Sequence, residues 1–273
     1  MATTAEGERL VQAHRLLLLR LGADVARDVR AAMRMLDLED IRDSWPALEA
    51  VLVSITERER RRAAGVASAV YARHRVAEGV VGSFVPRPPN PLDIDQLRVN
   101  LRVVGPGTAG NLVRQARPDA MEITSTKVIG EVQRNVQNGS REVISNSVVA
   151  DQQAVGWIRR LGSNPCGFCT MLASRGPVYK SRDTARAVGT ERETGQAIFS
   201  ENINDFAAHQ HCYCTVEPVY DANAPWPEEN QRAQDRWNEV TSTPATPDDP
   251  TSRPPSGRDA LNALRRSLAD SPL

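Results

Sequence analysis

The sequence predicts a mainly α-helical protein that carries a small α+β module towards its C-terminus. Aromatic residues make up only 4% of the 273 residues, so the core must be built largely from aliphatic side chains. Apolar residues recur at three- and four-residue steps through the N-terminal third, which is typical of amphipathic helices. All four cysteines lie in two short clusters late in the chain, which marks a separate module there.

Residues 1–81 predict two long helices in an antiparallel hairpin. Over 4–36 the apolar positions form one stripe, and most arginines fall elsewhere. The second helix begins near Asp43, where a capping side chain and the early Pro46 suit a first turn, and it continues to about residue 70. The charged run 58–62 at its midpoint is interpreted as a solvated helix face, with a nucleic-acid or partner contact as the alternative.

Residues 82–96 predict a proline-rich linker, because prolines remove amide donors and favour extended backbone. The next unit, 97–220, opens with an alternating apolar stretch over 97–103 that resembles a short strand. Further patterns follow in order: helices after Thr108, over 118–136 and over 140–153, with Asn138-Gly139 as a break, and then a strand over 155–161.

The chain becomes less regular after residue 220. An acidic segment, 221–242, contains a short predicted helix over 228–240. The proline-rich stretch 243–256 is predicted to be disordered. A short amphipathic helix over 257–273 follows, which we interpret either as a docking peptide or as a frayed tail.

The net charge of zero is an average over unlike segments. Residues 51–200 carry 21 basic and 13 acidic side chains, a net charge of +8, whereas residues 201–250 carry 2 and 10, a net charge of −8. No whole-molecule field therefore draws the protein to nucleic acid or to a membrane surface. No apolar run approaches the ~20 residues of a membrane span and no signal peptide is recognised, so we expect a soluble, intracellularly made protein without a membrane partner.

The cysteine clusters have the spacing of a metal site. Cys166 and Cys169 form a Cys-x-x-Cys turn, and a second cluster of cysteines and histidines follows about forty residues later, as in zinc knuckles and ribbons. The predicted ligands of a structural zinc ion (Zn²⁺) in a knuckle-like module are Cys166 and Cys169 with two or more of His209, Cys212 and Cys214, and His211 is less favoured.

The spacing leaves open whether the ligands are four cysteines or three cysteines and one histidine. Two disulfides or four buried thiols are the alternatives to a metal. A redox role lacks the βαβ frame in which a Cys-x-x-Cys motif opens a helix, and a catalytic zinc would need an open coordination position, whereas ligands are here in excess.

Several features of this module occur together over about residues 110–220: Trp157, Cys166-x-x-Cys169, Arg175-Gly176-Pro177-Val178-Tyr179, His209-x-x-Cys212-x-Cys214 and Val216-x-Pro218. Their order resembles the C-terminal part of phage Mu F-like minor head proteins, a family associated with the portal region of tailed-phage heads and with head morphogenesis. The helical N-terminus and residues 44–48 also resemble actinobacteriophage proteins encoded beside the portal and often labelled capsid maturation protease. The sequence departs from the family at His209-Gln210-His211, where many members have His-Pro, and at 181–200, which resembles an inserted loop.

The resemblance implies a structural virion component, a minor capsid protein that contacts the portal and the major capsid or scaffold protein. It would reside in the capsid interior near the portal, and in the host cytoplasm during assembly.

A capsid maturation protease is the first alternative, with no catalytic residues assigned. His14, interpreted as packed or half exposed, and His74, interpreted as solvated, are the only histidines outside the cluster, and no Gly-x-Ser-x-Gly or His-Glu-x-x-His motif occurs. Nonspecific DNA contact through the basic middle is the second alternative, although aromatic stacking residues are few.

Overall fold

The computed structural model is mainly helical, and it describes residues 2–162, 165–176, 187–190, 197–199, 212–242 and 257–273. The predicted disordered stretch 243–256 lies outside the described residues, as does most of the predicted loop 181–200. The elements follow the chain in the order α1 (Ala5–Ala32), η1 (Met33–Met35), α2 (Ile41–Ala77), α3 (Ile94–Arg102), the π-helical turn η2 (Val103–Gly107), α4 (Thr108–Arg114), α5 (Ala120–Ala150), β1 (Gly156–Arg160), α6 (Gly167–Ala173), β2 (Ala187–Thr190), β3 (Ala197–Phe199), β4 (Thr215–Val219), α8 (Glu228–Ser242) and α9 (Gly257–Asp270).

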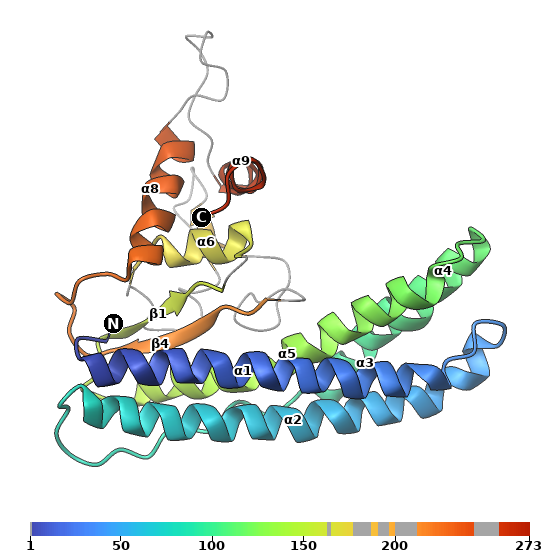
Figure 1. The fold of residues 1–273 in the computed structure, drawn as a ribbon, viewed down its shortest axis with the longest axis horizontal. Helices are drawn as coiled ribbons and strands as arrows, with labels where there is room; N and C mark the ends of the chain where they lie inside the picture. Colours follow the sequence, from blue (N-terminus) through green and yellow to red (C-terminus); the bar gives the residue numbers. More distant parts are fainter. Residues whose placement is uncertain (1, 163–164, 177–186, 191–196, 200–211, 243–256) are drawn as a thin grey trace, which may run out of the picture.

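The three long helices α1, α2 and α5 lie side by side in an elongated bundle (Figure 1). The first two form the predicted antiparallel hairpin, and their caps are formed by Thr4 and by Asp40, whose side chains accept amide hydrogen bonds. The apolar stripe of α1, including Val25 and Val29, packs in one core with Leu48 of α2 and with residues of α3 and α5. The side of each helix that carries these periodic apolar residues is therefore the side that faces the interior of the bundle.

Helix α5 continues through Asn138 and Gly139, so the predicted break at these residues is wrong. Gly139 lies where α5 crosses α2 closely. A Cβ atom at Gly139 would lie 2.7 Å from Cγ and 2.9 Å from the backbone oxygen of Arg60. The glycine thus serves close helix packing rather than a turn, and an Asn-Gly pair alone does not distinguish the two.

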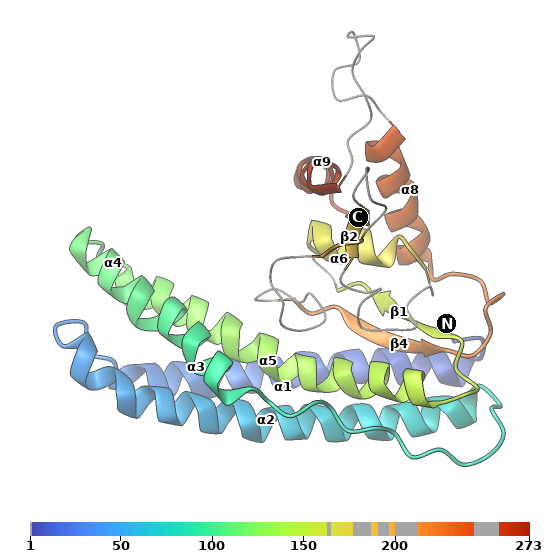
Figure 2. The ribbon, with the colours of Figure 1, turned by 180° about the vertical axis from the view of Figure 1, so that it is seen from behind.

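The alternating stretch at 97–103 is helical, so the predicted strand is also wrong. Leu97 and Leu101 are one helical turn apart and are both buried, whereas Val99 and Val103 are exposed. The side chain of Asp93 accepts a hydrogen bond of 2.9 Å from the Gln96 amide and begins α3. In so short a run, apolar residues at alternate positions also include a pair four residues apart, here Leu97 and Leu101, which suits a helix equally well. The helix forms because this pair packs against α2 and α5 (Figure 2).

The C-terminal elements form a second layer on one side of the bundle (Figures 1 and 2). Strands β1 and β4 pair antiparallel, with Gly156 opposite Val219 and Arg160 opposite Thr215, which confirms the strand predicted over 155–161. The strand pair lies between the bundle and α6, and α8 and α9 pack on α6. Leu261 and Leu264 of α9 are buried, so the last helix is docked rather than frayed.

Two positions on α2 that were predicted to be solvated are buried. Arg60 has an exposed fraction of 6%, and its Nη2 atom lies 2.6 Å from Oε2 of Glu142 on α5, while the neighbouring arginines of the run are exposed. His74 has no exposed surface, and its ring lies 5.9 Å from the ring of Tyr220. Both are covered by elements distant in sequence, which local charge patterning cannot reveal. His14, expected to be packed or half exposed, is packed, with an exposed fraction of 2%.

Candidate metal centre

The cysteines are positioned by a helix start and by a strand start. Cys166 occupies the N-cap of α6, where its sulfur accepts a hydrogen bond of 3.3 Å from the amide of Cys169 in the first turn. Cys212 and Cys214 directly precede β4. Because β4 pairs with β1, Cys214 lies beside the residues that follow β1, and its sulfur accepts a hydrogen bond of 3.3 Å from the Gly162 amide. Residues distant in sequence therefore meet at one end of the strand pair.

Three sulfurs form a compact buried cluster. The Sγ atoms of Cys169, Cys212 and Cys214 all lie within 4.8 Å of one another, and those of Cys169 and Cys212 are 3.3 Å apart. All three side chains are buried, and Cys166 packs against the same cluster. His209 and His211 lie outside the described residues, so the structure brings together the cysteines among the predicted ligands and places neither histidine.

The donor set fits a soft divalent metal. Four thiolates around a zinc ion at about 2.3 Å lie about 3.8 Å from one another in tetrahedral geometry, close to the separations in this cluster. The four cysteines are free thiols, so none is tied up in a disulfide. Cys169, Cys212 and Cys214 could therefore hold a metal ion, with Cys166 the nearest further thiol.

The thiols share hydrogen bonds that move their pKa values apart. A hydrogen bond with the Cys169 side chain is the main cause that lowers the pKa of Cys166. The same contact acts to raise the pKa of Cys169, but hydrogen bonds from Cys212 and Cys214 outweigh it and lower that pKa to about 7. Hydrogen bonds with Cys169 and Cys212, together with burial, raise the pKa of Cys214. The contacts within the cluster thus lower the pKa values of Cys166 and Cys169 and raise that of Cys214.

Two buried arginines direct guanidinium groups at the sulfurs. Arg159 Nη1 lies 3.7 Å from Sγ of Cys169, and Arg141 Nη2 lies 3.6 Å from Sγ of Cys212. Their exposed fractions are 0% and 1%. Positive donors beside these buried sulfurs would stabilise the negative charge of a metal ion held by several thiolates. Sequence reasoning assigned neither residue to the metal centre. Every residue of β1 is buried, so no alternation marks Arg159 as inward-facing.

Another buried polar network joins the C-terminal layer to the bundle. The guanidinium of Arg160 lies 2.7 Å from Glu217 of β4, 2.7 Å from Glu229 of α8 and 3.1 Å from Glu8 of α1. Glu217 also lies 3.8 Å from Nε2 of His74, whose pKa burial lowers. This network links five elements, α1, α2, β1, β4 and α8, and holds the C-terminal layer on the bundle.

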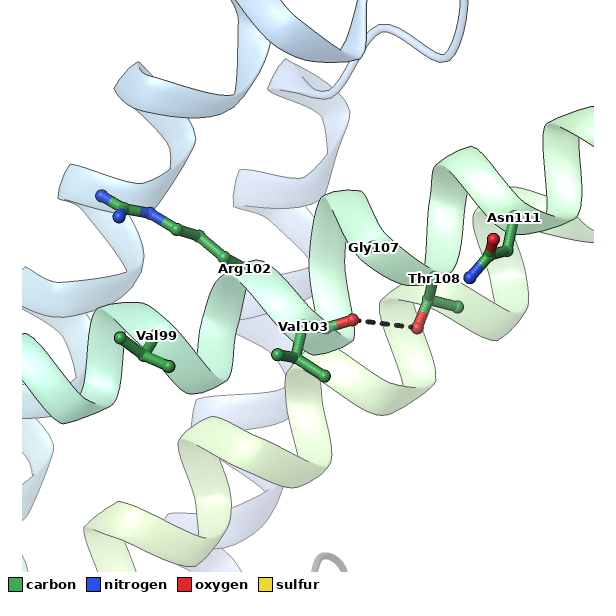
Figure 3. A pocket seen from close by; sticks show the side chains of 6 residues that line it. All are labelled: Val99, Arg102, Val103, Gly107, Thr108 and Asn111. Carbon is green, nitrogen blue, oxygen red and sulfur yellow. Dashed lines mark hydrogen bonds between the residues drawn. The ribbon is translucent and has the colours of Figure 1, made fainter.

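The described residues also form a shallow hollow of about 600 Å³ at the distal end of the bundle (Figure 3). The lining side chains come from α3, η2 and α4: Val99, Arg102, Val103, Gly107, Thr108 and Asn111. The guanidinium of Arg102 is engaged by Glu49 at 3.0 Å, and the hydroxyl of Thr108 donates to the backbone oxygen of Val103. Within this lining no cluster of titratable groups occurs, so the hollow is poorer in chemistry than the cysteine cluster.

Fold and site together define a class of protein: an elongated helical bundle whose C-terminal layer is organised around a cluster of thiols. None of the helices in the described segments has the length and apolarity needed to cross a membrane. The family model for VG15 protein matches residues 1–240, and the chain belongs to this family.

A curated relative points the same way. The chain is 28% identical over 171 residues to the Gene 15 protein of Mycobacterium phage D29, a match that covers 56% of this chain and 62% of the relative. The match therefore spans less than two thirds of that relative's length. No solved structure matches the chain. These findings identify a phage gene 15-type protein, and neither names the Mu F-like family, so that resemblance stays a prediction.

Proposed function

We propose that this protein is a structural minor component of a tailed-phage head, acting in head morphogenesis in the manner predicted for Mu F-like proteins. The observation that carries the proposal is membership of a phage protein family over residues 1–240, supported by the similarity to a mycobacteriophage Gene 15 protein. The architecture is consistent with such a role, because buried arginines tie long helices to the C-terminal layer: Arg160 pairs with Glu8 of α1, and Arg141 of α5 donates to the backbone oxygen of Cys212.

The cysteine cluster serves, in this proposal, as a zinc-dependent structural staple. Cys166 and Cys169 would hold the ion together with two or more of His209, Cys212 and Cys214. A bound zinc ion crosslinks chain segments, and in small zinc modules its binding contributes roughly 10–16 kcal/mol at neutral pH. Here it would fasten α6 to the start of β4, a region whose own apolar cluster is small.

The proposed partners are the portal protein and the major capsid or scaffold protein, with the protein inside the capsid near the portal. The test is co-expression with portal and major capsid proteins, followed by purification of particles and crosslinking with mass spectrometry. We expect the protein in the particles and crosslinks from it to the portal. Particles that do not contain the co-expressed protein, or crosslinks from it to unrelated host proteins alone, would refute the proposed role.

A capsid maturation protease is the second candidate, and a contact between a histidine and a serine is the reason to test it. Nε2 of His14 lies 2.9 Å from the hydroxyl oxygen of Ser140, the pairing expected of a base and a nucleophile. Both side chains are buried between α1 and α5, with exposed fractions of 2% and 0%, and burial lowers the pKa of His14 to about 4. A peptide would have to enter the bundle to reach this pair, so we interpret it as an interhelical hydrogen bond.

Mass spectrometry of the capsid-protein termini distinguishes the two functions. Particles made with wild-type protein, with Ser140→Ala and with His14→Gln should carry the same termini if the role is structural. Cleavage that depends on the wild-type protein and disappears in Ser140→Ala would establish the protease instead. Solubility and circular dichroism of each variant serve as the folding control.

A further inference from the structure

Arg141 belongs to the bundle but reaches into the cysteine cluster. It lies on α5 with an exposed fraction of 1%. Its Nε donates to the backbone oxygen of Cys214 at 3.1 Å, and its Nη2 donates to the backbone oxygens of Cys212 and Cys214 at 2.9 and 2.8 Å. Gln137 and Asn138, one turn earlier on α5, accept from the same guanidinium and fix its direction. This side chain therefore joins the bundle to both residues of the second cysteine pair.

The partners of its guanidinium distinguish Arg141 from three other buried arginines. Arg60, Arg75 and Arg160 each form an ion pair with a carboxylate, at 2.6, 2.9 and 2.7 Å. Within the described segments the acceptors of Arg141 are neutral oxygens and the sulfur of Cys212, at 3.6 Å. A buried cation without an opposite charge is strongly unfavourable. Of the groups that Arg141 contacts, the Cys212 sulfur is the one that belongs to the candidate metal centre.

We propose that Arg141 is a positioning residue of the metal centre, whose positive charge balances the thiolates that hold the metal and couples metal binding to the packing of α5. The inference rests on the proposed metal site. A divalent ion with three or four thiolate ligands has a net charge of −1 or −2, which a neighbouring guanidinium stabilises. Removal of the metal takes this negatively charged centre away from the guanidinium of Arg141, and the contact between α5 and the cysteine pair weakens.

The test separates the charge of Arg141 from its hydrogen bonds. Lysine keeps the charge and glutamine keeps a donor without charge, while both lose the forked geometry of the guanidinium. Zinc affinity of the full-length protein is measured by competition with a chromophoric chelator. We expect Arg141→Gln to bind zinc about tenfold more weakly than Arg141→Lys, in the range found for groups that support metal ligands. Equal affinities of the two variants would overturn the role of the charge.

Arg60 is a matched control, because it is a buried arginine of α2 that also contacts α5. Arg60→Gln removes a guanidinium that donates to Asn90, Asn135 and Glu142, and among the described residues it has no hydrogen bond to a cysteine. It should lower stability and leave zinc affinity within about twofold of wild type. A comparable loss of zinc affinity in Arg60→Gln would show that general loosening, and not Arg141, explains the effect.

A second measurement needs no variant and applies even if Arg141→Gln does not fold. Hydrogen exchange of the wild-type protein is compared with zinc and after chelation. Amides of α5 around residues 137–145 should exchange faster without the metal, and unchanged protection there would contradict the coupling. If the wild-type protein binds no zinc at all, the metal site itself fails. If it binds zinc but shows neither effect, only the role of Arg141 fails.

Discussion

Substituting Gly139 by alanine tests the close packing of α5 on α2. The new Cβ would lie 2.7 Å from Cγ and 2.9 Å from the backbone oxygen of Arg60, and the second atom cannot move without shifting α2. Such overpacking costs about 1–3 kcal/mol. Alanine also gains about 1 kcal/mol over glycine in a helix, which opposes the loss. Because one contact is to backbone, we expect a steric cost in the upper part of this range, about 2–3 kcal/mol, and hence a net loss of about 1–2 kcal/mol.

Gly65 on α2 provides the matched control, because a Cβ there meets nothing within 4 Å. Gly65→Ala should therefore raise the free energy of unfolding by about 1 kcal/mol, the helix-propensity gain alone. Urea denaturation of both variants and wild type, followed by circular dichroism at fixed zinc concentration, measures the two signs. Unfolding of Gly139→Ala at the same urea concentration as wild type, or at a higher one, would refute close packing as the role of this glycine.

Three further predictions concern buried charge and the thiols. Burial holds the pKa of His14 at about 4, below its unfolded value of about 6.5, so between these values the unfolded state binds more protons and stability falls as pH decreases. The free energy of unfolding should fall by about 2 kcal/mol between pH 7.5 and 5 because of this residue. In the same urea titrations, His14→Gln should lose about 2 kcal/mol less than wild type over this pH range. Arg160→Met removes an ion-pair partner from the fully buried Glu217 and from Glu8 of α1, and it should lower the free energy of unfolding by about 3–5 kcal/mol. A loss below about 1 kcal/mol in urea denaturation would contradict the role of Arg160 in joining the C-terminal layer to the bundle. Cys169→Ser should weaken zinc retention on gel filtration far more than substitution of the exposed Val85 by serine, and equal retention would remove Cys169 from the ligand set.

The long helices could be predicted from sequence because their packing follows a simple period. Leu18, Leu21, Val25 and Val29 on α1 lie on one side of the helix and are all buried. The strand over 155–161 was likewise found, and the cysteine spacing identified the residues that the structure brings together. In these cases the signal is local, since period and spacing directly describe which atoms face one another.

The remaining features depend on contacts between distant segments. The stretch containing Leu97 and Leu101 fits a strand or a helix until the bundle supplies the partner surface. Gly139 reads as a break until Arg60 of α2 is placed against it. Burial of His74 comes from β4, more than a hundred residues away, so no neighbouring residue announces it. Arg141 was missed for the same reason.

The balanced charge of the chain also acquires a structural meaning. Arg160, from the basic residues 51–200, pairs with Glu217 and Glu229 from the acidic residues 201–250, and Glu8 of α1 pairs with the same guanidinium. These pairs lie in the same layer as the cysteine cluster. Part of the compensation between the two segments is therefore direct contact between oppositely charged side chains.

The metal content of the purified full-length protein tests the central claim most directly. Elemental analysis should find about one zinc ion per chain in the wild type, and much less in a variant that carries Cys169→Ser and Cys212→Ser together. Wild-type protein that holds less than about a tenth of a zinc ion per chain, and does not take up added zinc or cobalt, would contradict a metal-stapled C-terminal layer.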